Sequence, residues 1–268
     1  MSTFLKNENK THVCPLFFVE KTFRYDPQNV LRNSTLEALA PRQNSAFSGY
    51  EWLKQDIIRG VFKPGEKLLM SALKERYDLG VGPLREALSQ LVAEKLVVAI
   101  SQKGYRVAPM SLEEMKDIYD ARANLEAMIV GLAIERGDDA WEASVLAQSH
   151  TLAKVMEVKT REQRLDVWDE RHKAFHTAIA SGCGSKHLLQ ARSYLFDQAE
   201  RYRHLWLTQT VFSEEALELK RQEHASLVEA ILARDAKRAS EMMRTHLMTP
   251  VPIIAEIMRA KGMGGPAR

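Results

Sequence analysis

Four histidines in the rear half of the chain have the residue type and the spacing of metal ligands. His172 and His176 are four residues apart, so on a helix they lie one above the other, on the face that also carries Trp168. His224 and His246 fall on the apolar faces of two later helices. A lone inward histidine is more often a core residue that hydrogen-bonds within the protein. Four histidines from three helices instead favour a divalent transition metal such as zinc, nickel or manganese, and the sequence does not choose among these metals.

Arg122 interrupts the apolar stripe of another helix in this half, between Ile118 and Leu125. A guanidinium that faces a helical bundle needs an anion nearby. That anion could be Glu126, another carboxylate of the protein, or the carboxylate of a ligand, and periodicity leaves these alternatives open. Arg122 is therefore a candidate effector-binding residue.

These side chains require a helical rear domain to position them. Ser111 and Glu114 form a capping box that starts a helix running to Gly137. Further helical stripes recur near 139–158, 161–181, 186–210, 213–233 and 235–248. A short tail is expected after Pro250. The sequence predicts a bundle of six or seven helices within residues 109–268, with no strand.

A different chemistry is indicated nearer the front of the chain, where short helices flank a tight turn. Helical spacing begins at Tyr50, Ser71 is placed to cap a second short helix, and Pro83 suits the first turn of a third. Two β-prone runs within 97–107 predict a hairpin. Three helices followed by a hairpin predict a winged helix-turn-helix in residues 45–108, whose third helix enters the DNA major groove.

Arg85 lies one turn inside that third helix, where its guanidinium could contact a guanine bidentately or clamp a phosphate. The alternative is a surface salt bridge to Glu86 or Glu94. Backbone N–H groups at the helix start, around Gly82, could hold a phosphate. Ser89 completes the set of DNA-binding candidates on this helix.

The tip of the predicted hairpin supplies two more DNA-binding candidates, Lys103 and Gly104. Glycine lets the main chain come close to a DNA backbone or minor groove, and lysine neutralises a phosphate. The alternative is an ordinary solvated turn.

The charge of the chain is uneven but modest, at +3 overall. Residues 1–44 hold 6 basic and 4 acidic side chains, residues 45–108 hold 10 and 7, and residues 109–268 hold 22 and 24. A basic front and a slightly acidic rear suit a DNA-binding module attached to another domain, although most such charges are simply solvated. We give this asymmetry little weight alone.

Other features of composition point to an ordinary cytoplasmic protein with no membrane partner. Cys14 and Cys183 are too far apart in sequence for a disulfide framework or a cysteine metal motif. Apolar runs stop well before the ~20 residues of a membrane helix, and the first residues do not resemble a secretory leader. Residues 1–44 show no sustained period, so we expect a poorly ordered extension there.

The front of the chain resembles the GntR superfamily in four runs that have the family's spacing. These runs are Lys63–Leu68, Leu73–Glu75, Pro83–Leu88 and Lys103–Val107. The resemblance implies a regulator that binds double-stranded operator DNA as a homodimer. Where the family commonly has Ser-Arg-Thr before the proline, this chain has Gly80-Val81-Gly82, so its operator should differ from those of typical relatives.

The rear resembles the effector-binding (FCD) domain of the FadR-type branch, over residues 110–248. The matching runs are Ala121–Glu126, Phe175-His176, His224 with Ala230-Ile231, and Arg244–Leu247. In metal-containing members an Asp and three His hold a metal, and a carboxylate effector completes its coordination. His176, His224 and His246 match the histidines, whereas His172 occupies the Asp position. Four neutral imidazoles would leave the charge of the cation to be balanced by an anionic effector.

Within this branch, Leu79–Leu91 and Asp120–Asn124 resemble a group of repressors that respond to glutarate. The resemblance makes glutarate the best candidate effector. A five-carbon dicarboxylate could place one carboxylate on the metal and the other on Arg122 or a neighbouring donor.

Three functions from different classes are thus open. The leading one is a homodimeric repressor that a small carboxylate releases from its operator, whether glutarate or another carboxylate. A metalloenzyme fused to a DNA-binding module is disfavoured, because no inward carboxylate beside the histidines is placed as a general base, and we expect no enzyme. A sequence-tolerant architectural DNA-binder is disfavoured because such proteins rely on a larger positive charge.

Overall fold

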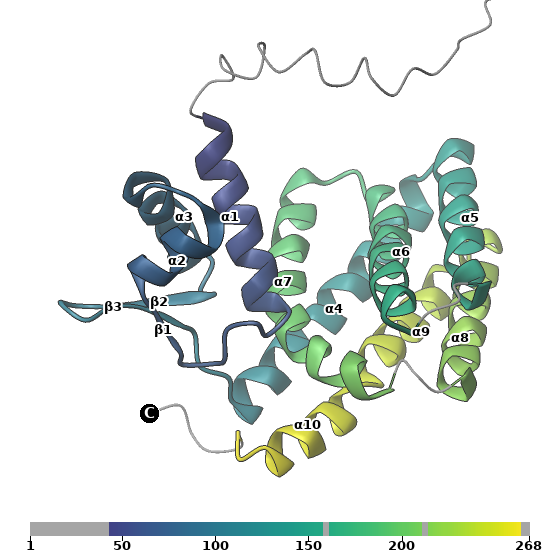
Figure 1. Cartoon of the computed structure of the whole chain (residues 1–268). Coiled ribbons are helices and arrows are strands. Elements are labelled where there is room, and N and C mark those ends of the chain that lie inside the picture. Colours follow the sequence, from purple (N-terminus) through teal and green to yellow (C-terminus); the bar gives the residue numbers. More distant parts are fainter. Residues whose placement is uncertain (1–42, 158–160, 211–213, 264–268) are drawn as a thin grey trace, which may run out of the picture. The chain divides into compact units, whose positions relative to one another are not determined.

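The computed structural model describes residues 43–157, 161–210 and 214–263 of the 268. The extension predicted for residues 1–44 lies, apart from its last two residues, outside this part. Within it the fold is mainly α-helical, with a three-stranded sheet in the N-terminal part and a helical bundle that follows it in the sequence (Figure 1). No helix in these ranges is both long enough and apolar enough to span a membrane. The predicted fold class is confirmed.

The front half of this architecture is a winged helix-turn-helix. Its elements are α1 (Gln43–Ile58), β1 (Lys67–Leu68), α2 (Met70–Tyr77), α3 (Val81–Ala93), β2 (Val97–Ile100) and β3 (Gly104–Val107). The strands are antiparallel in the order β1-β3-β2, with Leu68 opposite Tyr105 and Val97 opposite Val107. Leu53, from α1, belongs to one buried apolar cluster with residues of α2, α3 and the sheet.

Two local details of this region differ from the sequence prediction. The first helix begins before Tyr50, at Gln43. The second begins at Met70, so Ser71 lies inside it and does not cap it. The reason is that β1 pairs with β3 as far as Leu68, a pairing too short to be read from sequence, and the helix follows directly. Pro83 lies in the first turn of α3, as predicted, and the helix begins two residues before it. The first turn tolerates a proline because its N–H groups have no partner within the helix.

Seven α-helices follow the hairpin within the described residues, in agreement with the predicted six or seven. They are α4 (Leu112–Arg136), α5 (Asp139–Ala153), α6 (Arg161–Ser181), α7 (Lys186–Thr210), α8 (Glu214–Leu232), α9 (Ala236–Met248) and α10 (Val251–Ala260). The predicted capping box is present at the start of α4, where the hydroxyl of Ser111 accepts a hydrogen bond from the Glu114 amide at 3.1 Å. The helix α4 packs against α9 and α7, and α5 lies beside α8 (Figure 1).

The short tail predicted after Pro250 is wrong, because residues 251–260 form α10. Pro252 lies in the first turn of this helix, where proline removes no helical hydrogen bond. Ile254 and Met258 are then buried on one face against the bundle. The apolar spacing, rather than the two prolines, was the informative signal here.

Candidate histidine centre and DNA-reading face

The structure brings together the four histidines that the sequence singled out. The helix α6 carries His172 and His176 one turn apart, α8 carries His224, and α9 carries His246. One potential ligand nitrogen from each ring lies within 4.8 Å of all the others. The histidines are therefore placed as one group at the junction of three helices.

The spacing of the group fits a metal ion. The Nε2 atoms of His224 and His246 are 3.3 Å apart. Two imidazole nitrogens that bind one tetrahedral zinc at about 2.0–2.1 Å also lie about 3.3 Å apart. Imidazole nitrogen suits zinc and nickel in particular, and small adjustments of the side chains would bring all four nitrogens to one ion.

The histidines of the group are also in the neutral form, which is the form of imidazole that binds a metal ion. Burial lowers the pKa of His172, His176 and His224 well below the usual value, and neighbouring imidazoles lower it further. Both ring nitrogens of His176 are buried without a hydrogen-bond partner among the described residues. A buried polar atom left in this way costs about 1–3 kcal/mol, and a bound cation would remove this cost for one of the two nitrogens.

A carboxylate that the sequence analysis missed supports the group. Glu223 accepts a hydrogen bond from Nδ1 of His246 at 2.7 Å and another from the ammonium of Lys220 at 2.7 Å. Burial raises the pKa of Glu223, but these two hydrogen bonds outweigh it and hold the pKa below its ordinary value. The ionised carboxylate fixes the tautomer of His246, so that its Nε2 is the nitrogen directed at His224.

Sequence periodicity gave no signal for Glu223 because it directly precedes His224. Consecutive residues of a helix point about 100° apart, so Glu223 reads as lying off the face of its own helix. It meets the group only because α9 packs alongside α8.

Arg122 is buried beside Glu126, one of the alternatives that the sequence left open. Its Nε lies 3.5 Å from a carboxylate oxygen of Glu126, but the other oxygen of Glu126 accepts a hydrogen bond from Arg192 at 2.9 Å. One carboxylate thus serves two guanidinium groups, and Nε of Arg122 has no hydrogen-bond partner among the described residues. Local charge and hydrogen-bonding capacity both remain available for an anion.

A small cavity of 30 Å³ joins Arg122 to the histidine group. His172, Lys220 and Arg203 line it, together with the fully buried Tyr119. The Tyr119 hydroxyl and Nη1 of Arg203 are buried donors without a partner in the described residues. This wall of donors and cations, which the sequence analysis did not identify apart from Arg122, suits a negatively charged ligand.

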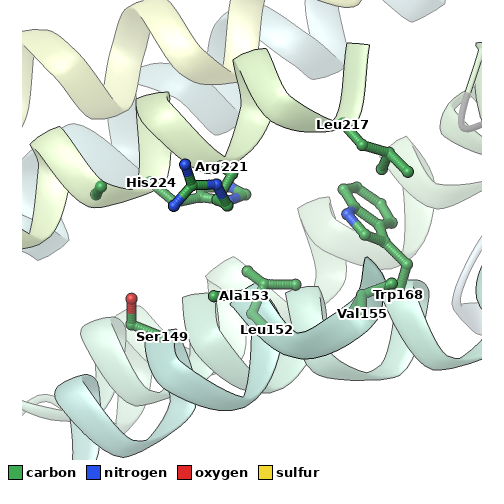
Figure 2. A pocket seen from close by; sticks show the side chains of 9 residues that line it. Ser149, Leu152, Ala153, Val155, Trp168, Leu217, Arg221 and His224 are labelled. Carbon is green, nitrogen blue, oxygen red and sulfur yellow. The ribbon is translucent and has the colours of Figure 1, made fainter. Parts of the chain in front are cut away.

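A second, apolar pocket reaches the histidine group from the side of α5 and α8. It measures 80 Å³ and is lined by Leu152, Trp168 and Leu217, with His224 in its wall (Figure 2). Figure 2 shows Arg221 beside His224, and this arginine pairs with Glu218 at 2.6 Å. The pocket therefore connects a mostly apolar opening to one of the four imidazoles.

The DNA-binding candidates lie on the other functional region, the winged helix. Arg85, Gly82 and Ser89 are exposed on α3, and Arg85 forms no ion pair with any described residue. The predicted alternative partner Glu94 instead bonds Lys54 at 2.9 Å. The Ser89 hydroxyl donates to the backbone carbonyl of Arg85 at 2.8 Å, which leaves the guanidinium free to reach outward.

The wing carries Lys103 and Gly104, both exposed. Gly104 has a φ of +85°, so a residue with a Cβ would be strained at this turn. The backbone conformation of the turn therefore favours glycine at position 104, whether or not this residue contacts DNA.

Comparisons with known proteins agree with this two-part arrangement. The family model for bacterial regulatory proteins of the gntR family matches residues 50–107, and the FCD domain model matches residues 117–249. The chain is 62% identical to the HTH-type transcriptional repressor GlaR of Escherichia coli (strain K12), over 80% of its own length and 97% of that protein. The chain belongs to the GntR family, in its FCD-containing, FadR-type branch.

Two further relatives of this GntR-family protein are less similar to it than GlaR is. The regulator BphR of Paraburkholderia xenovorans (strain LB400) is 34% identical over 77% of this chain and 84% of that protein. The solved structure of E. coli McbR/YncC has a TM-score of 0.67 at 21% identity, covering 79% of this chain and 97% of that one, and so shows the fold alone. GlaR, BphR and the gntR family are regulators of transcription, so the chain is a regulator rather than an enzyme.

In this regulator α7 connects the two functional regions. Asp197 on α7 bonds the ammonium of Lys54 on α1 at 2.7 Å. The next residue, Gln198, donates to the backbone carbonyl of Glu94 at the end of α3 at 2.6 Å. The same helix carries Arg192 and so also reaches the surroundings of Arg122.

Proposed function

We propose that the protein is a homodimeric transcriptional repressor that binds operator DNA and releases it when a small carboxylate binds. Residues 45–108 would form the DNA-binding domain and residues 109–268 the effector-binding and dimerisation domain. The observation that carries the proposal is a group of three buried histidines and one partly buried histidine beside a cavity. That cavity is lined by cations and by donor atoms that have no hydrogen-bond partner among the described residues.

The four histidines would hold one divalent metal ion. Their nitrogens fit zinc, nickel or manganese, and the resemblance to metal-containing relatives supports this ligand set with His172 in place of an aspartate. The cation would supply a Lewis-acidic site for an anion. Because all four imidazoles are neutral, no protein ligand offsets its charge, which favours a negatively charged effector.

Glutarate is our candidate effector, with another small carboxylate as the alternative. Arg122 would bind the carboxylate that is distant from the histidines, with Tyr119 and Arg203 as further donors. The cavity is only 30 Å³, so binding would require the surrounding helices to separate. That requirement gives the effector a reason to prefer a second conformation, which is what a switch needs.

The conformational signal would pass through α7. This helix contacts Glu126 through Arg192 on one side and the winged helix through Asp197 and Gln198 on the other. A displacement of α7 caused by the effector would therefore change how α1 and α3 are held. Allosteric couplings of this kind are typically about 1–3 kcal/mol.

The decisive experiment is a gel shift with the DNA upstream of the protein's own gene. The metal-loaded protein should retard this DNA, and glutarate should release it. Pretreatment with a chelator should abolish the response to glutarate while leaving the retardation itself. Succinate, adipate and valerate test chain length and the need for a second carboxylate.

Two results would contradict the proposal in different parts. Retardation that no carboxylate changes would refute the assigned effector class. A response to glutarate that survives complete removal of the metal would refute the histidine centre as the effector site. Measuring the mass of the protein in solution and of its operator complex would test the homodimer.

A further inference from the structure

Val81 is an apolar residue that the core of the winged helix does not use. It is the first residue of α3 and is 38% exposed. It precedes Arg85 by four residues, so both side chains lie on the same side of the helix. The opposite side of α3 is buried through Leu84, Leu88 and Leu91. Val81 thus belongs to the face that carries the DNA-binding candidates.

The residue that follows it, Gly82, is not required by the fold. Its φ is outside the left-handed region, and a Cβ placed there would meet nothing within 4 Å. A glycine inside a helix costs roughly 0.5–1 kcal/mol relative to alanine. Gly80 before it caps α3 without any side-chain hydrogen bond. Val81 is therefore flanked by two residues without side chains, and another molecule can come close to the first turn of α3.

The chemistry of the major groove identifies what such a side chain can recognise. An isopropyl group neither donates nor accepts hydrogen bonds, so it cannot read the polar edges of bases. The one apolar group that a base pair presents in the major groove is the C5-methyl of thymine. Residues at the N-terminal end of a recognition helix are those that reach the base edges.

We propose that Val81 selects thymine in the operator by packing against its C5-methyl group. The inference rests on the proposed placement of α3 in the major groove. Four residues of helix rise about 6 Å, which is roughly two base-pair steps. The thymine read by Val81 therefore lies within about two base pairs of the base contacted by Arg85.

The test removes the methyl group from the DNA and the isopropyl group from the protein independently. Each thymine of an operator that the protein footprints is replaced in turn by deoxyuridine, which keeps base pairing and lacks only the methyl. For the unaltered protein, one replacement per half-site should weaken binding about fourfold, as expected for one methyl group returned to water. Val81→Ala should bind the original operator more weakly and show no further loss at that replacement.

A matched control is Val98→Ala, at a similarly exposed valine that lies on β2 and not on α3. It should keep the full sensitivity to deoxyuridine. Val81→Ile, which retains a branched apolar side chain, should keep it as well. Because Val81 is exposed, its substitution is not expected to unfold the domain, and a thermal melt checks this.

The outcomes distinguish a failure of the role proposed for Val81 from a failure of the proposed function. If no deoxyuridine replacement weakens binding, or if Val81→Ala shows the same loss as the unaltered protein, Val81 does not read thymine. If the unaltered protein protects no discrete site at all, the proposed function itself fails.

Discussion

The two functional regions of this regulator use opposite placements of their polar side chains. On the winged helix, Arg85 and Lys103 are exposed and point away from an apolar core. In the bundle, Arg122 and His176 are buried inside the protein. An exposed group can meet a large partner such as DNA, whereas a buried group can only meet an ion or a small molecule, and its unpaired atoms impose a cost until it does.

The largest effect is expected from removing the exposed guanidinium. Arg85→Ala would lose one base contact in each half-site of a dimer, at about 1–3 kcal/mol each. In a gel shift, operator affinity should then be weaker by a factor that lies between roughly thirty and more than a thousand. The thermal shift caused by glutarate should stay unchanged. Retardation as tight as that of the unaltered protein would show that α3 is not the recognition helix.

Substituting a buried histidine is expected to have the opposite effect, with loss of metal binding and of the glutarate response but not of operator binding. His176→Asn removes a ligand nitrogen, so competition with a chelator should show a loss of metal affinity exceeding the 10–100-fold typical of outer partners. Operator binding without glutarate should persist, and release by glutarate should be lost. His187→Asn, at an exposed histidine, is the control. Equal metal content in His176→Asn and the control would exclude His176 as a ligand.

A smaller loss is expected at the carboxylate behind the histidines. Glu223→Gln removes the charge that orients His246, and should weaken metal binding by about 10–100-fold. The matched control is Glu218→Gln on the same helix, whose partner is Arg221 at the surface. If both substitutions have the same effect, Glu223 does not act through His246.

The smallest effect is expected in the pH dependence of stability of the metal-free protein. The pKa of His176 is lowered in the folded state by burial, so the unfolded chain binds more protons below pH about 6.5. Stability should therefore fall as the pH falls. Between pH 7 and pH 6 this histidine should contribute about 0.7 kcal/mol of that fall.

Denaturant titrations of the metal-free protein at both pH values measure this contribution. The fall in stability should be smaller by that amount in His176→Asn and unchanged in His187→Asn. An unchanged fall in His176→Asn would mean that the folded protein also protonates this ring.

Much of the fold was predictable because helical spacing and local caps are short-range signals. Ser111 and Glu114 specify the start of α4 by themselves, and the stripe of α3 shows which way Arg85 faces. The start of α2 was not predictable, since it depends on the pairing of Leu68 with Tyr105, far along the chain. Pro252 misled the reading of α10 because a proline is compatible both with a helix start and with a break.

The candidate site also contains residues that the sequence predicted and residues that only the structure revealed. Sequence periodicity named His172, His176, His224 and His246, because each lies on an apolar stripe where burial without a partner would be costly. It also named Arg122 but left its anion open. The roles of Glu223, Tyr119 and Arg203 were not accessible, since each depends on how its helix packs against other helices.

The sequence by itself thus determined all the helices but α10, the faces that they bury, and the direction of Arg85, Arg122 and the four histidines, because these depend on neighbours three or four residues away. The tertiary structure alone decided that the four imidazoles meet, that Glu223 orients one of them, and that Glu126 is shared between Arg122 and Arg192. Those outcomes depend on how α4, α6, α7, α8 and α9 pack against one another, and packing between distant segments leaves no periodic trace in the chain.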